Sequence, residues 1–452
     1  MRVHLIAIGG SAMHNLALAL HQKGYDLSGS DDEIFEPSKS RLLNAGLLPD
    51  KIGWNPDRIT EDLDVVILGM HARKNNPELL KAKELGLKVV SYPEFIYEQS
   101  KDKQRVVIAG SHGKTSITAM ILYVLSKLGI DCDYLVGAQL EGFHTMVKLS
   151  DAPLMIIEGD EYLSSPIDRR PKFLWYRANI AVISGIAWDH INVFPTFDDY
   201  KAQFAAFIDS IIEDGSLIYY EKDENIKSIL KTHSGSLELK PYTTHAYKLE
   251  DGKTLLIDNG DLYKVEIFGK HNLQNLNAAL QVCLELGVTK ADFYAAIATF
   301  KGAAKRMELI AENALSKVFK DFAHAPSKLK ASVAAAKEQF PGKRLIACVE
   351  LHTFSSLTKS FLDQYSGSMD MADRAMVYYN PHTIAHKGLE EISKQEVKQA
   401  FSPSQIEVFN NSDEIKASLE AADYQNTILL LMTSGNFDGI NLDAFGKALL
   451  KA

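Results

Sequence analysis

The sequence has few of the residues that mark secreted, zinc-binding or nucleic-acid-binding proteins. Only three of its 452 residues are cysteines, Cys132, Cys283 and Cys348, and they lie far apart in apolar surroundings. This spacing fits neither a disulfide framework nor a zinc site, so we expect buried, reduced thiols. The formal net charge is −9, from 49 Lys and Arg against 58 Asp and Glu. That balance argues against broad electrostatic binding to nucleic acid or acidic lipid.

Long apolar runs are missing as well. No stretch approaches the length that spans a membrane, and no charged-then-apolar leader precedes the first apolar run at Val3. Hydrophobic residues make up 46% and charged residues 24%, as in globular proteins. A chain of 452 residues is long for a single core, so two or three domains are expected. The composition predicts a cytoplasmic, multidomain protein.

The sequence does contain a phosphate-binding loop. Residues 110–116 read Gly-Ser-His-Gly-Lys-Thr-Ser, after an apolar run at residues 105–109 and before a helix-periodic stretch. In such a loop, backbone N–H groups and a helix N-terminus face a polyphosphate, a lysine reaches the terminal phosphates and a threonine hydroxyl holds Mg²⁺. The loop is shortened, because Ile108 occupies the position of the usual first glycine. We expect nucleotide binding, with Lys114 facing solvent; the alternative is an ordinary turn.

The first hundred residues alternate short strands with helices. The predicted elements are strands at Val3–Ile8, Tyr25–Ser30, Asp64–Leu68 and Lys88–Ser91 and a helix at Met13–Gln22. A glycine turn at Gly9 and Gly10 follows the first strand, and Asp31 ends the second. This pattern is a Rossmann-like opening, although the full G-x-G-x-x-G is missing. A phosphate-bearing ligand and a purely structural turn are both open interpretations.

The second part begins near Lys103 and places polar residues after predicted strands. The predicted elements are strands at Pro153–Ile157 and Ile180–Ile186, a helix at Phe197–Ile211, hairpins within Tyr242–Phe268 and a helix that continues to Leu286. Glu158 follows the first of these strands, and Asp189 and His190 follow the second. Open α/β sheets bind ligands at the C-terminal ends of their strands, and a carboxylate there suits Mg²⁺. His190 fits a metal ligand, a base or a structural cap.

Three polar residues open the helix that follows the hairpins. His271, Asn272 and Asn275 lie on one helical face at a spacing of three to four residues. They are candidates for ligand binding, and the alternative is capping of the helix N-terminus, for which Asn is well suited.

The third part begins near Lys305, after an expected hinge at Gly302–Lys305. The predicted elements are strands at Val318–Phe322, Arg344–Glu350 and Thr427–Met432 and a helix at Ser327–Gln339. Pro326 is typical of a first helical turn. Asp321 and His324 precede it, and we expect both to be exposed at the C-terminal edge of a parallel sheet with helices on both faces.

These motifs occur in the order found in the Mur ligases, and the chain resembles that family over essentially its whole length. The matching motifs are residues 110–116, Glu158-Gly-Asp-Glu161, Asp189-His190, His271-Asn-x-x-Asn275, Asp321-Phe-Ala-His324-x-Pro326, Gly9-Gly10-Ser11-x-Met13 and Gly29-Ser30-Asp31. The resemblance implies an α/β fold of three domains in a bacterial cell-wall ligase. The three implied domains are a UDP-sugar-binding Rossmann-like domain at 1–102, a central P-loop ATPase domain at 103–303 and a C-terminal Rossmann-like α/β ligase domain at 304–452.

The resemblance also assigns residues to ligands, with ATP and Mg²⁺ as cofactors. It implies catalytic roles for Lys114, Glu158 and His190, and metal binding by Thr115, Glu158 and His190. The implied ATP-binding residues are Gly110, Ser111, His112, Gly113, Lys114, Thr115, Ser116, His271, Asn272, Asn275, Arg306, Asp321 and His324. The implied UDP-sugar-binding residues are Gly9, Gly10, Ser11, Met13, Asp31 and His71.

Two branches of the family share this type of N-terminal domain and differ in the amine that they join to UDP-N-acetylmuramate. One adds L-alanine. The other, the murein peptide ligases, recycles L-alanyl-γ-D-glutamyl-meso-diaminopimelate. Residues 161–176 and 434–440 resemble the second branch. The cations Arg169 and Arg170 suit a donor with several carboxylates, unless this segment is a solvated loop.

The sequence departs from the family pattern at three places. Gly159 stands where alanine is usual, Ala325 stands where a histidine is common, and residues 350–353 read Glu-Leu-His-Thr where Glu-Pro-Arg-Ser is expected. The last departure puts the family's contact from the arginine position in doubt.

Two other classes of function compete with the ligase. A dinucleotide-dependent oxidoreductase would explain the Rossmann-like opening but would leave the phosphate-binding loop without a role. A non-enzymatic P-loop regulator would use that loop but gives no role to the first domain.

Overall fold

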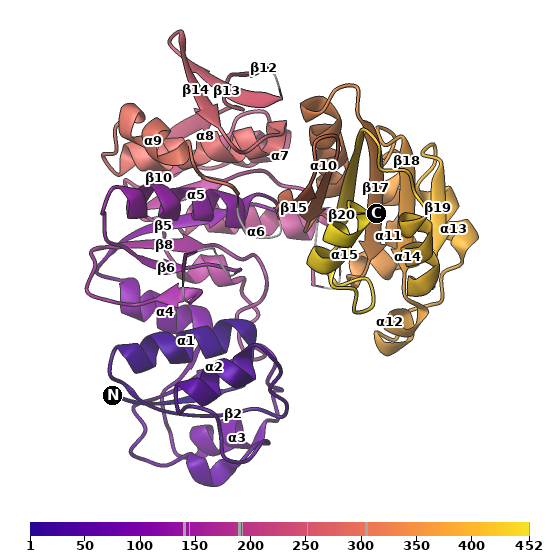
Figure 1. Ribbon diagram of the computed structural model, residues 1–452. Helices are drawn as coiled ribbons and strands as arrows, with labels where there is room; N and C mark the ends of the chain where they lie inside the picture. The colour runs from indigo at the N-terminus through magenta and orange to yellow at the C-terminus, as the bar shows by residue number, and fades with distance from the viewer. Residues whose placement is uncertain are drawn as a thin grey trace. The chain divides into compact units, whose positions relative to one another are not determined.

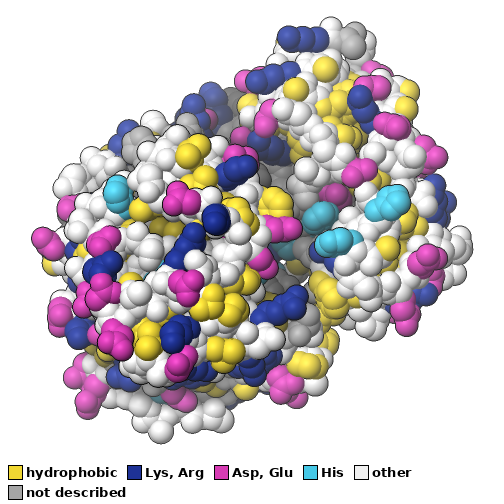
Figure 2. All heavy atoms as spheres, turned by 90° about the horizontal axis from the view of Figure 1, so that it is seen from below, with side chains coloured by type: hydrophobic (Ala, Val, Ile, Leu, Met, Phe, Trp, Pro, Cys, Tyr) yellow, Lys and Arg dark blue, Asp and Glu magenta, His cyan; other side chains and the backbone are white. Residues whose placement is uncertain are grey.

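The computed structural model describes residues 1–138, 142–143, 145–188, 191, 193–250, 252–302 and 306–451. The chain divides into two compact units. Unit 1 comprises Met1–Ile186, Thr196–Tyr242 and Ala278–Thr289, and unit 2 comprises Ala187–Pro195, Thr243–Asn277 and Lys290–Ala452. Among the described residues, no helix is both long enough and apolar enough to cross a membrane. Acidic and basic side chains are interspersed on the face shown in Figure 2.

The N-terminal part of unit 1, coloured indigo to violet in Figure 1, contains a parallel sheet of four strands with the order β2-β1-β3-β4. Its elements are β1 (Arg2–Ile6), α1 (Ser11–Gln22), β2 (Asp26–Ser30), α2 (Ser38–Asn44), β3 (Val65–Leu68), α3 (Pro77–Glu84), β4 (Val89–Ser91) and α4 (Tyr92–Ser100). Side-chain oxygens of Asn76 and Ser91 cap α3 and α4. The four predicted strands and the predicted first helix agree with these bounds to within two residues.

A second sheet in unit 1 has seven strands with the order β11-β10-β9-β5-β8-β6-β7. Its elements are β5 (Gln104–Ala109), α5 (Lys114–Lys127), β6 (Asp133–Leu135), β7 (Val147–Lys148), β8 (Leu154–Glu158), β9 (Ile180–Ile183), α6 (Phe197–Asp209), β10 (Ser216–Tyr220), α7 (Glu224–Leu230) and β11 (Glu238–Tyr242). All neighbouring strands are parallel except β6 and β7. Because β5 lies between β8 and β9, the loop after β5 and the residue that ends β8 share one sheet edge.

Unit 2 contains a small antiparallel sheet of three strands. It comprises β12 (Tyr247–Glu250), β13 (Lys253–Asp258) and β14 (Asp261–Val265), and the helices α8 (Lys270–Glu285) and α9 (Lys290–Ile297) follow in the chain. Asn259 and Gly260 join β13 to β14 with φ angles of 49° and 94°. Positive φ at both central residues is the geometry of a two-residue hairpin turn, so the hairpin predicted at this position is confirmed. Asp251, in the other predicted turn, lies outside the described residues.

The larger sheet of unit 2 has six strands with the order β15-β16-β20-β17-β18-β19. The strands are β15 (Glu308–Glu312), β16 (Lys317–Asp321), β17 (Arg344–Leu351), β18 (Arg374–Tyr379), β19 (Ile406–Phe409) and β20 (Thr427–Met432). The helices are α10 (Pro326–Gln339), α11 (Lys359–Leu362), α12 (Pro381–His386), α13 (Lys394–Ala400), α14 (Ser412–Glu420) and α15 (Leu442–Leu449). Two separate apolar cores, one with side chains of α10 and α13 and one with side chains of α14 and α15, confirm the expected helices on both faces.

One strand corrects the expectation of a purely parallel sheet. β15 runs antiparallel to β16. Only residues 313–316 join the two strands, and a parallel connection needs a dozen or more residues. The short connection therefore forces a hairpin at this edge.

The three cysteines are free and buried. Burial raises the pKa of the Cys132 and Cys283 thiols to about 12, and it raises the pKa of Cys348 even further. The predicted burial of these thiols is confirmed, and all three are protonated and unreactive at neutral pH.

Candidate active site

The phosphate-binding loop joins the central strand β5 to α5. Gly110 and Gly113 have φ angles of 126° and 81°, a backbone conformation that glycine adopts without strain. A side chain at Gly110 would collide with Ser184, which follows β9, and the Ser184 hydroxyl donates a hydrogen bond to the His112 carbonyl. The end of β9 thus holds the loop in place at the N-terminus of α5, where an anion is favoured.

Glu158 and Thr115 meet at the C-terminal edge of the seven-stranded sheet. The Thr115 hydroxyl donates to Glu158 Oε1 at 2.8 Å, and the Gly137 backbone N–H donates to Glu158 Oε2 at 2.8 Å. Glu158 is 8% exposed, and a Cβ atom at Gly137 would lie 2.9 Å from its Oε1. A carboxylate and a hydroxyl so close together fit a hard cation such as Mg²⁺.

The third predicted metal ligand, His190, lies outside the described residues, as does Asp189. Among the residues that the structure describes, no group of three or more His, Cys, Asp or Glu side chains could hold a metal ion. Of the three predicted metal ligands, the structure therefore describes Thr115 and Glu158, which contact each other.

Lys114 is mostly buried, which corrects the expectation that it faces solvent. Its ammonium donates to the Gly110 carbonyl at 2.6 Å and to Glu161 Oε2 at 2.7 Å. The Lys114 side chain is 15% exposed and that of Glu161 is 0% exposed. Burial acts to lower the pKa of Lys114, but the carboxylates of Glu161 and Asp160 outweigh it and raise that pKa. Lys114 is therefore a stable cation at the loop.

The sequence did not predict the polar contacts of Tyr200. This residue lies on α6 and is 0% exposed, and its hydroxyl donates to Glu161 Oε1 at 2.9 Å. The same hydroxyl lies 2.8 Å from Ser111 Oγ in the phosphate-binding loop. In the sequence, Tyr200 has only the periodicity of a buried helix position, which gives no sign of a polar partner.

The segment after Glu161 is a loop built around Asp168. The carboxylate of Asp168 accepts hydrogen bonds from Arg170 Nε at 2.9 Å, from Arg170 Nη2 at 3.1 Å and from the Trp175 indole at 2.9 Å. The Arg170 guanidinium also lies 4.2 Å from the centre of the Trp175 ring. Arg170 is thus engaged within the loop, whereas the neighbouring Arg169 is exposed. These contacts favour the solvated-loop interpretation for Arg170.

Gly159, one of the departures from the family pattern, has a steric reason in this chain. A Cβ atom there would lie 2.8 Å from Val107 Cγ1 and 3.3 Å from Phe173 Cβ. Glycine therefore lets the chain turn away from β8 directly beside β5 and the short helix η2 (Lys172–Trp175).

In the N-terminal sheet, the residues expected to bind a UDP-sugar gather after β1, β2 and β3. The Gly9 N–H donates to Asp31 Oδ2 at 2.7 Å, and a Cβ atom at Gly10 would lie 3.8 Å from His71 Cδ2. Ser11 is exposed at the start of α1. Met13 is only 4% exposed and belongs to the core rather than to the surface.

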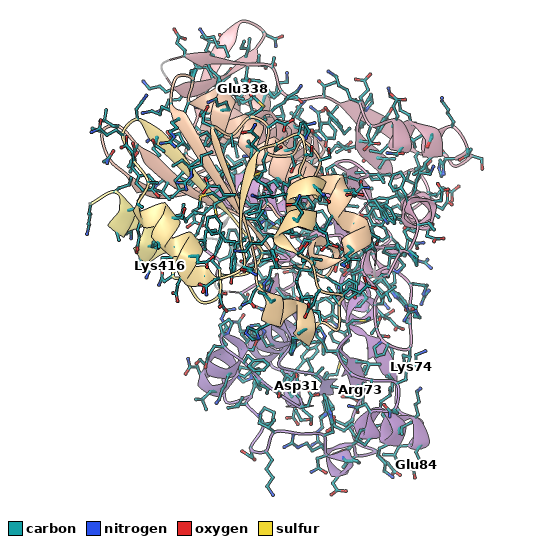
Figure 3. The ribbon with its side chains drawn as sticks, turned by 90° about the vertical axis from the view of Figure 1, so that its right-hand side faces the viewer. Asp31, Arg73, Lys74, Glu84, Glu338 and Lys416 are labelled. Atoms are coloured by element: carbon teal, nitrogen blue, oxygen red, sulfur yellow. The ribbon has the colours of Figure 1, made fainter. Side chains whose placement is uncertain are left out.

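Among these residues, Asp31 has a raised pKa. Burial and a hydrogen bond with the neighbouring Asp32 raise the pKa of Asp31 to about 6, although the hydrogen bond from Gly9 N–H acts in the opposite direction. Figure 3 shows Asp31 in the same part of unit 1 as the exposed cations Arg73 and Lys74.

Asp321 in unit 2 is buried, so the prediction that it is exposed was wrong. It ends β16 and is 6% exposed. Its carboxylate accepts hydrogen bonds from the Ser332 hydroxyl on α10 and from the Met307 N–H at 3.2 Å. The helix that begins at Pro326 packs over the strand end and covers this carboxylate. Burial lowers the pKa of His271, and the charge of Asp321 opposes that shift, which places the two residues within electrostatic reach.

His324 and Arg306 gather around Phe322. The His324 ring contacts the Phe322 ring edge-on at 5.1 Å between centroids, and the Arg306 guanidinium lies 4.7 Å from the centre of the Phe322 ring. His324 Nδ1 also lies 2.9 Å from the Phe322 carbonyl oxygen. Ala325, another departure from the family pattern, is buried at the N-cap of α10.

Asn272 and Asn275 are buried on α8. The Asn272 amide donates to the Phe268 carbonyl at 2.9 Å. Capping of a helix N-terminus requires the side-chain oxygen to accept an N–H, so this contact is not the capping interaction considered for Asn272.

The segments 350–353 and 434–440 meet where β17 and β20 end. Glu350 is 2% exposed and accepts hydrogen bonds from the Thr433 hydroxyl and from the Phe437 N–H at 2.9 Å. His352 Nδ1 lies 3.6 Å from Glu350 Oε1. Burial acts to raise the pKa of Glu350, but its hydrogen bonds with His352 and Thr433 outweigh it and lower that pKa. A Cβ atom at Gly435 would lie 2.7 Å from Glu350 Oε2, which explains the glycine.

The predicted ATP-binding residues therefore fall into two groups. Unit 1 holds residues 110–116, and unit 2 holds His271, Asn272, Asn275, Arg306, Asp321 and His324.

Models of three Mur ligase domains match the chain in succession. They are the Mur ligase family catalytic domain at residues 2–104, the Mur ligase middle domain at residues 108–283 and the Mur ligase glutamate ligase domain at residues 305–435.

Curated relatives and a solved structure match nearly the whole chain. The UDP-N-acetylmuramate--L-alanine ligase of Sulfurihydrogenibium sp. (strain YO3AOP1) is 30% identical over 458 residues, which cover 99% of this chain and 98% of that protein. The UDP-N-acetylmuramate--L-alanyl-gamma-D-glutamyl-meso-2,6-diaminoheptandioate ligase of Escherichia coli (strain K12) is 25% identical over 464 residues, 99% of each chain. The crystal structure of UDP-N-acetylmuramate-alanine ligase MurC from Thermotoga maritima has a TM-score of 0.71 at 19% identity, covering 100% of this chain and 98% of that chain. The expected three-domain α/β fold is confirmed.

Proposed function

The chain belongs to the Mur ligase family of ATP-dependent amide-bond ligases, and we propose that it joins UDP-N-acetylmuramate to L-alanyl-γ-D-glutamyl-meso-diaminopimelate. The observation that carries the ligase chemistry is the arrangement at the end of β5. It combines a phosphate-binding loop, a charged lysine and a hydroxyl–carboxylate pair suited to Mg²⁺.

The chemistry requires activation of the sugar-nucleotide carboxylate. A carboxylate does not accept an amine at neutral pH, because hydroxide is a poor leaving group. Transfer of the terminal phosphoryl group of ATP to a carboxylate oxygen gives an acyl phosphate and releases ADP. The amine nitrogen then attacks the acyl carbon, the C–N bond forms, and the C–O bond to phosphate breaks. Phosphate leaves with the electron pair, and the amine nitrogen loses a proton.

Lys114 contributes a fixed positive charge to the first step. Its ammonium is held by the Gly110 carbonyl and Glu161, so it is already oriented when a nucleotide binds. Such preorganised charge stabilises the phosphoryl group as it transfers. Thr115 and Glu158 would hold Mg²⁺, which supplies further positive charge to the phosphates when bound.

The first sheet is the proposed site for the sugar nucleotide. Gly9 and Gly10 follow β1, Asp31 follows β2 and His71 follows β3. Ligands of open α/β sheets bind outside these strand ends. The arrangement supports the residues assigned to UDP-N-acetylmuramate by the family resemblance.

The choice of the tripeptide rests on the loop at residues 161–176, whose sequence resembles that of the peptide-adding branch. Within this loop, Arg169 is exposed and is the candidate to bind a carboxylate of the donor, since Arg170 is engaged with Asp168. L-Alanine is the second candidate. The 30% identity to an L-alanine ligase over nearly the whole chain favours it.

A donor panel tests both levels of this proposal. Phosphate release is measured with ATP, Mg²⁺ and UDP-N-acetylmuramate, adding either the tripeptide or L-alanine, with Lys114→Ala as the background control. We expect a higher kcat/KM for the tripeptide. A clear preference for L-alanine would establish the second candidate instead, and phosphate release that does not depend on UDP-N-acetylmuramate would overturn the proposed sugar-nucleotide substrate.

A further inference from the structure

A chain of polar contacts connects the second residue of the phosphate-binding loop to its lysine through a helix outside the loop. Ser111 Oγ lies 2.8 Å from the Tyr200 hydroxyl, the Tyr200 hydroxyl donates to Glu161 Oε1 at 2.9 Å, and Glu161 Oε2 accepts from Lys114 at 2.7 Å. All four residues belong to unit 1. Ser111, Tyr200 and Glu161 are each at most 3% exposed.

The chemistry of the groups sets the direction of each hydrogen bond. Lys114 is a cation, so it donates to Glu161, and an ionised carboxylate only accepts. The single phenolic proton of Tyr200 is therefore directed to Glu161. Consequently the Ser111 hydroxyl donates to the Tyr200 oxygen.

This arrangement fixes the ammonium of Lys114 and leaves one of its N–H groups available. An ammonium has three N–H donors, and two of those on Lys114 go to Gly110 O and to Glu161. The third remains for a phosphate oxygen. Glu161 carries a negative charge beside the place where a polyphosphate is expected, and the hydroxyl of Tyr200 disperses part of that charge. The hydroxyl thus makes a buried carboxylate compatible with an anionic ligand.

The ring of Tyr200 is anchored independently of its hydroxyl. It contacts Phe204 edge-on at 5.3 Å between centroids, and Phe204 contacts Phe173 of η2 at 5.6 Å. The backbone N–H of Phe173 in turn donates to the Asp160 carbonyl at 3.1 Å. Removing only the hydroxyl should therefore leave the aromatic packing in place.

We propose that Tyr200 is a positioning residue for phosphoryl transfer, whose hydroxyl couples Ser111 to Glu161 and so fixes the ammonium of Lys114. This inference rests on the proposed use of ATP. It does not depend on which amine the enzyme takes.

The test compares Tyr200→Phe with Ser111→Ala and with the double variant. The control is Tyr294→Phe in unit 2, which also removes a buried hydroxyl, one that lies 2.8 Å from His245 Nε2. Three quantities are measured: the Kd of Mg-ATP without any acceptor, and kcat and KM with whichever donor the wild type turns over. We expect Tyr200→Phe to lower kcat about 10-fold and to weaken ATP binding by a smaller factor, with Tyr294→Phe close to wild type in both.

Coupling between the two positions separates positioning from general loss of stability. If Ser111 acts through Tyr200, the losses of activity and of ATP affinity in the double variant are no larger than those in the more impaired of the two single variants. Multiplying losses, or a Tyr200→Phe variant with wild-type kcat and Kd, would overturn the inference. If the wild type turns over neither donor, the proposed function fails, while the ATP affinities of the same variants still decide for or against the coupling. Should Tyr200→Phe fail to fold, Ser111→Ala with unchanged ATP affinity and kcat would refute it.

Discussion

At the scale of single residues, Lys114 forms a buried ion pair with Glu161, so its removal should have two separable effects. Lys114→Ala should lower turnover by roughly 10²–10³, since it removes a charge that stabilises phosphoryl transfer. It also leaves the fully buried Glu161 without its cation, which should reduce stability by up to about 3 kcal/mol. Thermal unfolding and phosphate release measure the two effects.

A second substitution distinguishes them. Adding Glu161→Gln to Lys114→Ala removes the unpaired charge, so the double variant should recover most of the lost Tm while remaining inactive. Recovery of activity along with Tm would mean that Lys114 acts only through the fold.

Glu158 should set the Mg²⁺ requirement. Glu158→Gln keeps the shape and can still accept the hydrogen bond from the Gly137 N–H while its NH2 group donates to the Thr115 hydroxyl, but it removes the charge that a hard cation prefers. The Mg²⁺ concentration for half-maximal turnover should rise about tenfold or more. Glu84→Gln, an exposed change on α3, serves as the control. Superimposable Mg²⁺ titrations for all three proteins would move the metal away from Glu158.

Asp31 should give the N-terminal sheet a stability that depends on pH. Its pKa of about 6 in the folded protein lies above the usual value near 4, so folding favours the protonated form. The stabilisation is fully present below about pH 4 and is lost as the pH rises through about 6. Asp31→Asn does not titrate. Its Tm relative to wild type should therefore increase by a few degrees between pH 4 and pH 7, and a constant difference would contradict the assignment.

At the scale of elements, the carboxylate of Asp168 connects two side chains of its loop, in addition to backbone contacts such as that between Ser164 and Arg170. Asp168→Ala would release both Arg170 and Trp175, so we expect faster trypsin cleavage after Arg169 and a change in tryptophan fluorescence. Asp198→Ala on α6, where the side chain is 90% exposed, is the control. If the loop contributes to donor binding, kcat/KM for the tripeptide should fall in Asp168→Ala with a smaller effect on the KM of ATP. Wild-type proteolysis would show that the loop is held by other contacts.

The elements that could be predicted from the sequence are those with strong, local signals. Strands such as β5 and β8 are short apolar runs between turn residues, and their positions were predicted to within one residue. β18 and β19 lie between helices with similar apolar content, so periodicity alone did not separate them. The antiparallel direction of β15 depends on the short connection to β16, which was not recognised in the sequence.

In the candidate site, too, some contacts could be predicted from the sequence and others could not. The proximity of Thr115 and Glu158 could be predicted from the sequence, because the ends of neighbouring parallel strands share one edge of a sheet. The burial of Asp321 could not, since it depends on Ser332 one helix later. The contact of Tyr200 with Ser111 joins positions 89 residues apart, and a tyrosine in an apolar helix face has the same pattern with or without a polar partner.

At the scale of the whole molecule, the residues that the family resemblance assigns to ATP belong partly to unit 1 and partly to unit 2. The phosphate-binding loop belongs to unit 1, and His271, Asp321 and His324 belong to unit 2. Water hydrolyses an acyl phosphate, so a productive site must exclude it. We therefore expect ATP and UDP-N-acetylmuramate together to change the distance between the units as part of the reaction cycle.

Because the three native thiols are buried, the expected change in distance between the units can be measured by fluorescence. Because Cys132, Cys283 and Cys348 are protonated and buried, maleimide dyes should leave them unlabelled while the protein is folded. Glu84→Cys and Lys416→Cys would place one reactive thiol on an exposed helix of each unit (Figure 3). Energy transfer between a donor and an acceptor dye should then change when both substrates are added, and labelling of the unmodified chain under the same conditions should be negligible. The three native cysteines can therefore stay in place while the distance between the two dyes is measured one molecule at a time.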